Sequence, residues 1–178
     1  MKAEIIFKEG FKLYKKDFGT LIVGTLLAAV GSILVITAPP LFFGVYYMGV
    51  KVAKGEDVEI NDVLKGFDYF ITSWVMSVIM LVSVIIGLVL LIIPGLLLLV
   101  LFQYAIPIAI MENAGAIESL KRSVRMGKSN FETSLIIAVV AWILNSVGGT
   151  VGAGWLLAYP YTVVCKCRAV QRLSAGKK

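Results

Sequence analysis

Residues 90–130 read LLIIPGLLLLVLFQYAIPIAIMENAGAIESLKRSVRMGKSN, and the order of the parts in this stretch decides the fold. One apolar run ends at Pro94 and Gly95, a second apolar run follows, and a basic amphipathic segment closes the stretch. Proline next to glycine interrupts a helix. The pattern is typical of one unit of a membrane protein, in which two apolar helices meet at a tight break and a charged helix follows.

The composition of the whole chain agrees with this interpretation. Hydrophobic residues make up 59% of the 178 residues, charged residues make up 16%, and the mean hydropathy is +0.91. Soluble domains are about 45–50% apolar and about 25% charged. A soluble fold of this size could not bury so much apolar surface, so we predict an all-α, polytopic integral membrane protein.

The apolar residues fall into six runs, at residues 18–38, 41–53, 69–93, 96–111, 131–148 and 153–165. A helix needs about 20 residues to cross a hydrocarbon core of ~30 Å. The second, fourth and sixth runs are shorter than this and could cross only with tilt or local thinning of the bilayer. Re-entrant hairpins buried in protein are the alternative for these runs. We predict six transmembrane helices arranged as three hairpins.

Charge predicts the orientation of these helices. The breaks at Pro39 and Pro40, at Pro94 and Gly95, and at 148–152 carry no charge, so all 17 Lys and Arg residues lie elsewhere. Lysine and arginine in short loops stay on the cytoplasmic side. We therefore predict a cell-membrane protein with both termini in the cytoplasm. The first apolar run is longer than the core of a signal peptide, which predicts an uncleaved first helix.

The chain also suggests one module written three times within a single membrane domain, residues 1–178. The units are about 1–56, 57–113 and 114–172, with a tail at 173–178. Each has a basic amphipathic segment, a long run, a break and a short run, and KKDFGT at 15–20 resembles KSNFET at 128–133. A pseudo-threefold repeat is one interpretation and chance similarity between apolar sequences is the other. We expect the amphipathic segments to lie in the cytoplasmic interface.

Small residues mark the faces on which membrane helices pack closely. They recur at about every fourth position in the long runs, as Thr20, Gly24, Ala28 and Ser32 in the first, Ser73, Ser77, Ser83 and Gly87 in the third, and Ser134, Ala138 and Ala141 in the fifth. We therefore expect the three long runs at the centre of the bundle and the short runs outside.

Several kinds of chemistry lack the residues they need. The chain has no histidine, and no ionisable residue lies deep inside an apolar run, which disfavours proton-coupled pumps. Cys165 and Cys167 do not have zinc or redox spacing. Asp57, Asp62 and Asp68 are interpreted as solvated loop or cap residues. We expect no catalytic, cofactor or metal site, and a protein that is not an enzyme.

Two groups of residues remain as candidates for function. The basic residues Lys12, Lys15, Lys16, Lys121, Arg122, Arg125 and Lys128 are expected to face anionic lipid or an acidic partner. The polar residues Tyr46, Gln103, Tyr104, Asn145 and Tyr159 either bond between helices or line a polar path.

The stretch at 92–131, IIPGLLLLVLFQYAIPIAIMENAGAIESLKRSVRMGKSNF, resembles a group of uncharacterised bacterial and archaeal membrane proteins. KVAKGEDVEINDVLKGFDYF at 51–70 extends the resemblance to most of the chain. The stretch is also similar to the membrane domain attached to some glycerophosphodiester phosphodiesterases, although no such catalytic domain is present here. The resemblance implies six spans and no established biochemical role.

These observations lead to one hypothesis and one alternative. The hypothesis is a non-enzymatic accessory or membrane-organising protein, whose basic cytoplasmic face binds anionic lipid, a partner complex or both. The alternative is a transporter or channel for a small or lipid-like solute. A protein partner or a homo-oligomer is compatible with both, and no nucleic acid is expected to bind.

Overall fold

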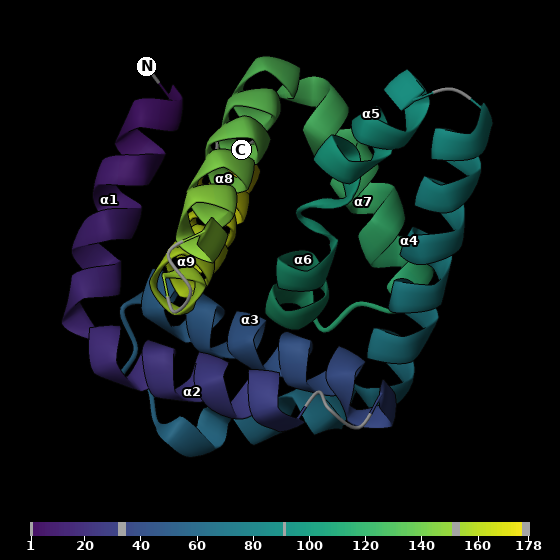
Figure 1. The fold of residues 1–178 in the computed structure, drawn as a ribbon. Helices are drawn as coiled ribbons and strands as arrows, with labels where there is room; N and C mark the ends of the chain where they lie inside the picture. Colours follow the sequence, from purple (N-terminus) through teal and green to yellow (C-terminus); the bar gives the residue numbers. More distant parts are fainter. Residues whose placement is uncertain (1, 32–34, 91, 151–153, 176–178) are drawn as a thin grey trace.

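The computed structural model describes residues 2–31, 35–90, 92–150 and 154–175, and these described residues form helices and turns without a strand. In chain order they are α1 (Lys2–Lys16), α2 (Phe18–Gly31), the 3-10 turn η1 (Val35–Thr37), α3 (Ala38–Lys54), the 3-10 segment η2 (Ile60–Tyr69), α4 (Phe70–Leu90), α5 (Ile92–Phe102), α6 (Ala105–Glu112), α7 (Ala116–Ser129), α8 (Phe131–Thr150) and α9 (Trp155–Ala175). In Figure 1, α2 runs along the lower part of the view with α3 beside it on the inner side, toward α6 and α9, and α4 forms the right-hand edge. The predicted all-α class is confirmed.

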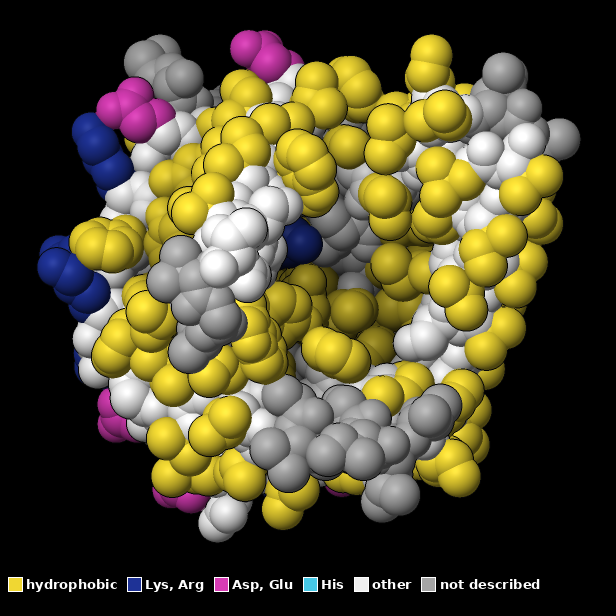
Figure 2. Space-filling view, viewed as in Figure 1, with side chains coloured by type: hydrophobic (Ala, Val, Ile, Leu, Met, Phe, Trp, Pro, Cys, Tyr) yellow, Lys and Arg dark blue, Asp and Glu magenta, His cyan; other side chains and the backbone are white. Residues whose placement is uncertain are grey.

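Three helical segments among the described residues are long and apolar enough to cross a membrane: Ile60–Val89, Ile92–Glu112 and Phe131–Thr150. Many of their large side chains face outward, and Val89 and Trp142 are 80% and 72% exposed. Figure 2 shows the flank formed by α4 covered by apolar side chains, whereas Lys and Arg gather mainly beside α1. Such a surface suits lipid rather than water. Three such helical segments are compatible with the predicted membrane protein. The six spans and the cytoplasmic termini stay predictions.

The expected position of the long helices is wrong. The centre of the fold is formed by α3, α6 and α9, which contact one another, while α2, α4 and α8 lie outside them. We call these the inner helices and the outer helices. Only 17% of the apolar window of Ile60–Val89, and of Phe131–Thr150, is buried. An outer helix can leave its apolar side chains in lipid without cost, so hydrophobicity does not drive it to the centre.

The small-residue faces do mark close contacts, but each packs within its own hairpin. A Cβ atom added at Gly24 on α2 would lie 2.5 Å from Met48 on α3. The corresponding atoms at Gly87 and Gly148 would lie 2.9 Å from the backbone of Gly95 on α5 and of Gly154 just before α9. These positions therefore hold α2 to α3, α4 to α5 and α8 to α9.

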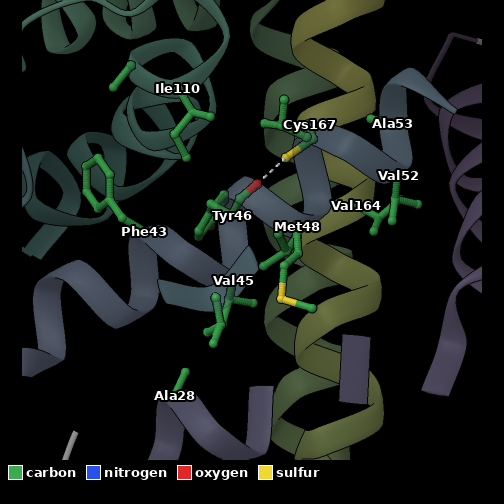
Figure 3. Close-up of a cluster of buried hydrophobic side chains, with 14 of the residues drawn as sticks. Ala28, Phe43, Val45, Tyr46, Met48, Val52, Ala53, Ile110, Val164 and Cys167 are labelled. Atoms are coloured by element: carbon green, nitrogen blue, oxygen red, sulfur yellow. Dashed lines mark hydrogen bonds between the residues drawn. The ribbon is translucent and has the colours of Figure 1, made fainter. Parts of the chain in front are cut away.

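Figure 3 shows the inner helices meeting around α3. Phe43, Val45, Tyr46 and Met48 project from α3, and Ile110 of α6 and Cys167 of α9 approach the same helix. Eleven residues of α3 are buried, although its run of apolar residues is one of the short ones. A helix buried on several sides needs apolar residues all round, whatever its length.

Three helix boundaries differ from the predicted runs. Pro39 and Pro40 lie in the first turn of α3, where proline fits because those N–H groups have no helical partner. The fourth run is broken at Gln103, because Pro107 lacks an N–H and its ring clashes with the carbonyl four residues earlier. The sixth run continues as α9, which ends at Ala175. The basic residues that follow the run therefore lie on the same helix as the run itself.

We call the amphipathic segments α1, η2 and α7 the leading segments. Two of them, η2 and α7, cover the inner part of the hairpin before them in the chain, and α1 covers that of the last hairpin. η2 packs on α3, and α7 packs on α5 and α6, while α1 packs on α9 at the other end of the chain. Tyr14 of α1 donates a hydrogen bond to the Leu157 carbonyl, and Tyr161 of α9 donates one to the Phe7 carbonyl. Most of the apolar stripe of α1, including Ala3, Ile6 and Tyr14, is therefore buried against protein, while Phe11 is 48% exposed. The predicted position of α1 in the interface stays a prediction.

Candidate functional site

The basic residues of α7 are presented by a helix that packs through small side chains. Ser119, Ser123 and Gly127 are buried on one face. The Ser123 hydroxyl donates a 2.6 Å hydrogen bond to the Leu101 carbonyl at the end of α5. A methyl group at Gly127 would come within 2.9 Å of the Leu101 side chain. This close fit leaves the long basic side chains on the outward part of the helix.

An open groove of about 470 Å³ lies where α7 meets the end of α5. We call it the basic groove, and it is lined by Phe102, Leu120, Val124, Lys121, Arg125 and Lys128. The first three residues give it an apolar floor, and the last three are exposed cations at helical spacing i, i+4 and i+7. Within the described part of the chain, no ion pair involves these three cations. An apolar floor beside unpaired cations suits an anionic amphiphile.

Arg122 does not belong to the basic groove, although it lies between groove residues in the sequence. It pairs with Glu112 at the end of α6, and its Nε lies 3.9 Å from Glu118 on α7. Helical geometry turns successive residues by about 100°, so Arg122 faces α6 when Lys121 and Arg125 face the groove. The structure therefore divides the four predicted basic residues of α7 into three groove cations and one structural partner.

The three predicted lysines of α1 have different surroundings. Lys12 is exposed. The Lys15 ammonium lies 4.7 Å from the centre of the Phe11 ring, a cation–π contact. Lys16 lies 3.1 Å from Asp57, and this hydrogen bond raises the pKa of the lysine. The structure does not place any of these lysines beside the basic groove.

Ion pairs join all three leading segments to the inner helices, and we call these the three clasps. Lys51 of α3 pairs with Asp62 of η2, Glu112 of α6 with Arg122 of α7, and Glu9 of α1 with Arg168 and Arg172 of α9. The sequence analysis did not identify the clasps. The sequence did contain a signal for them. A charged residue lies near the end of each inner helix, and the leading segment that covers this helix carries a residue of opposite charge.

Asp62 is a cap residue, which is one of its two predicted roles, but it is not solvated. Its side chain is 12% exposed and accepts a 2.7 Å hydrogen bond from Lys51 and a 2.9 Å bond from the Glu59 backbone N–H. The cap of η2 is therefore built from Glu59 and Asp62. Asp57, by contrast, is 93% exposed. In the described part of the chain, no group of three or more Asp, Glu or Cys residues could hold a metal ion.

The predicted polar residues lie in separate places. At the α5–α6 break, Gln103 donates from Nε2 to the Ser134 carbonyl at 2.8 Å, and the Tyr104 hydroxyl donates to Ser134 Oγ at 3.2 Å. Asn145 of α8 donates to Thr162 of α9 at 3.2 Å. Both amides therefore bond between helices, and whether either lines a path stays a prediction.

Tyr46 and Tyr159 belong to the apolar core around α3. The Tyr46 carbonyl accepts a weak contact from the Cys167 thiol at 3.9 Å, drawn in Figure 3. Tyr104 lies in a second apolar cluster with Ile108 and Ile137. The five polar residues thus divide between two clusters and the α8–α9 contact.

Comparisons with family models, with curated proteins and with solved structures found no match to this chain. The resemblance to uncharacterised membrane proteins and to the membrane domain of some phosphodiesterases therefore stays a prediction from the sequence. The case for function depends on the basic groove, the clasps and the apolar surface.

Proposed function

We propose that the chain is a six-span protein of the cell membrane, with three hairpins related by a pseudo-threefold repeat and both termini in the cytoplasm. The order of contacts supports the repeat. Each outer helix packs on its own hairpin partner and on the hairpin before it: α2 on α3 and α9, α4 on α5 and α3, α8 on α9 and α5. The leading segments and their clasps follow the same cyclic order. The same set of neighbours in all three units favours a repeat over chance similarity.

The function that these features support best is that of a non-enzymatic accessory or membrane-organising protein. It binds anionic lipid through its basic cytoplasmic face and holds a partner complex at the membrane. The basic groove is the observation that carries this proposal, because its three cations form no ion pair with any described residue and its floor is apolar. Each basic side chain near an anionic leaflet contributes about 1 kcal/mol of attraction.

Gentle extraction from the native membrane, followed by mass spectrometry of the bound molecules, tests this function. We expect the protein to retain anionic lipids above their share of the membrane, together with a stoichiometric protein partner. Higher salt in the extraction buffer should reduce the retained anionic lipid, because salt screens exposed charges. Retention of lipids in proportion to the membrane, with no protein partner, would contradict the proposal.

A transporter or channel is the second candidate, and one observation favours it. Gln103 Oε1 is buried and accepts no hydrogen bond from the residues that the structure describes, and it lies at a break in an apolar helical segment. The bond from Nε2 to Ser134 fixes the orientation of the amide, so Oε1 is left to accept from a water or a polar solute. Broken helices of this kind line the binding sites of many transporters.

Flux through liposomes distinguishes this candidate from the first. If Gln103 and Asn145 line a path, Gln103→Leu and Asn145→Leu should each reduce solute flux at least about tenfold, the effect of an interaction near 1.4 kcal/mol. Both variants should retain anionic lipid as the wild type does. Ser129→Ala, at an exposed position, is the control, and unchanged flux in this variant shows that a substitution in the α7–α8 region does not by itself damage the protein. Unchanged flux in both leucine variants would eliminate a path through these residues.

A further inference from the structure

We propose that the basic groove binds one lipid that carries two phosphate groups, with a hydrocarbon chain on the apolar floor. This inference rests on the proposed lipid binding and names its ligand class and its site. The groove meets the requirements of such a lipid in charge, in length and in the chemistry of its floor.

The charge of the groove exceeds that of a headgroup with a single phosphate. Lys121, Arg125 and Lys128 supply three positive charges, and within the described residues no carboxylate pairs with them. A lipid with one phosphodiester carries one negative charge and would leave two cations unmatched. Arg125 can hold a phosphate through two parallel N–H bonds, and the flanking lysines can act as point charges.

The spacing of the cations also fits two phosphates. From Lys121 to Lys128 the helix rises about 10 Å, at 1.5 Å per residue. A single phosphate could contact both ends of such a row only if the flexible lysine stems converged on it, whereas two phosphates joined by a short linker can reach all three cations without that convergence. Basic pockets beside membrane helices bind headgroups of this kind.

The floor of the groove distinguishes a lipid from a soluble phosphate compound. Phe102 and Leu120 are buried by their neighbours, and Val124 is partly exposed between the cations. A soluble diphosphate would leave this apolar surface in water. A hydrocarbon chain would cover it, which adds about 25 cal/mol for each Å² removed from water. The occupant is therefore anchored by its chain as well as by its charge.

The experiment compares cardiolipin, which has two phosphates, with phosphatidylglycerol, which has one. Wild-type protein is placed in phosphatidylcholine nanodiscs that contain either lipid at equal total phosphate, and native mass spectrometry counts the lipids retained after gentle extraction. We expect one cardiolipin to remain, with half-saturation at a mole fraction about fivefold lower than for phosphatidylglycerol, since the second phosphate engages one further basic side chain, which contributes about 1 kcal/mol.

Two variants test the site itself. The triple substitution Lys121→Gln, Arg125→Gln and Lys128→Gln should raise the half-saturation for cardiolipin about a hundredfold. The matched triple Lys8→Gln, Lys54→Gln and Lys65→Gln removes the same charge from exposed positions outside the predicted lipid-facing set and should change the half-saturation little. Val124→Trp fills the floor with all charges kept and should also abolish retention of cardiolipin. Thermal unfolding in detergent shows that each variant is folded.

The outcomes separate the site from the function. If both triples weaken retention equally, or cardiolipin binds no better than phosphatidylglycerol, the two-phosphate site is overturned while anionic lipid binding stands. If soluble pyrophosphate displaces cardiolipin at a comparable concentration, the hydrocarbon chain of the lipid contributes nothing to binding, and the assignment to a lipid fails. If the wild type retains no anionic lipid above phosphatidylcholine, the proposed function fails together with the site.

Discussion

Replacing Gly44 with alanine is expected to prevent the chain from folding. The added Cβ atom would lie 1.8 Å from the carbonyl oxygen of Val63, where η2 crosses α3. The obstacle is backbone, so no change of side-chain rotamer relieves it. Gly66 is the reciprocal position, and its Cβ atom would lie 1.9 Å from the Pro40 carbonyl. Overpacking costs about 1–3 kcal/mol where side chains can adapt, and more where the backbone must move.

The yield of monodisperse protein in detergent and its thermal midpoint measure this effect. Gly44→Ala and Gly66→Ala should each give aggregated protein, because a loss above 3 kcal/mol is a large share of the usual 5–15 kcal/mol. Gly19→Ala is the matched control, since nothing lies within 4 Å of a Cβ atom there. A stable, monodisperse Gly44→Ala protein would show that η2 does not approach α3 as described.

Asp62→Ala is expected to cause the second largest loss of stability, about 3 kcal/mol. The substitution leaves Lys51 without its partner in a partly buried clasp and also removes the acceptor for the Glu59 N–H. Breaking a buried ion pair costs about 3–5 kcal/mol and an exposed one at most about 1, so this clasp lies between. Loss of a helix cap adds about 1 kcal/mol.

Chemical unfolding in a fixed detergent measures the free energy of unfolding for this series. Asp62→Asn retains an oxygen for the Glu59 N–H and should lose less stability than Asp62→Ala. Asp57→Ala removes a carboxylate that is 93% exposed and should change stability little, although it also breaks an ion pair. Equal losses for Asp57→Ala and Asp62→Ala would mean that the clasp between α3 and η2 does not stabilise the fold.

The periodicity of the sequence predicted the elements better than their arrangement. Long apolar runs and amphipathic stripes depend on neighbours in the chain, so α4, α8 and the stripe of α1 could be recognised locally. The central position of α3 could not, because apolar composition looks the same whether a helix faces lipid or protein. The break at Gln103 had a local signal in Pro107, which our interpretation of the fourth run as one span did not use.

The candidate site shows the same limit. Helical spacing alone would have placed Lys121, Arg125 and Lys128 together and turned Arg122 away from them. The spacing of residues within α7 could not identify the residues that α7 contacts, because Glu112 and Phe102 belong to earlier helices. The clasp between Glu9 and Arg172 joins residues 163 positions apart. The sequence shows both charges, but no local pattern indicates that these two residues pair.

The packing of α1 on α9 has a consequence for biosynthesis. A ribosome completes α1 before α9, so α1 cannot reach its partner until all the helices between them have been made. Until then its apolar stripe needs another cover, and a basic amphipathic helix can rest on the surface of the membrane. The interfacial position that the sequence predicts for α1 would then describe the nascent chain before α9 has been made. Docking on α9 is then the step that completes assembly.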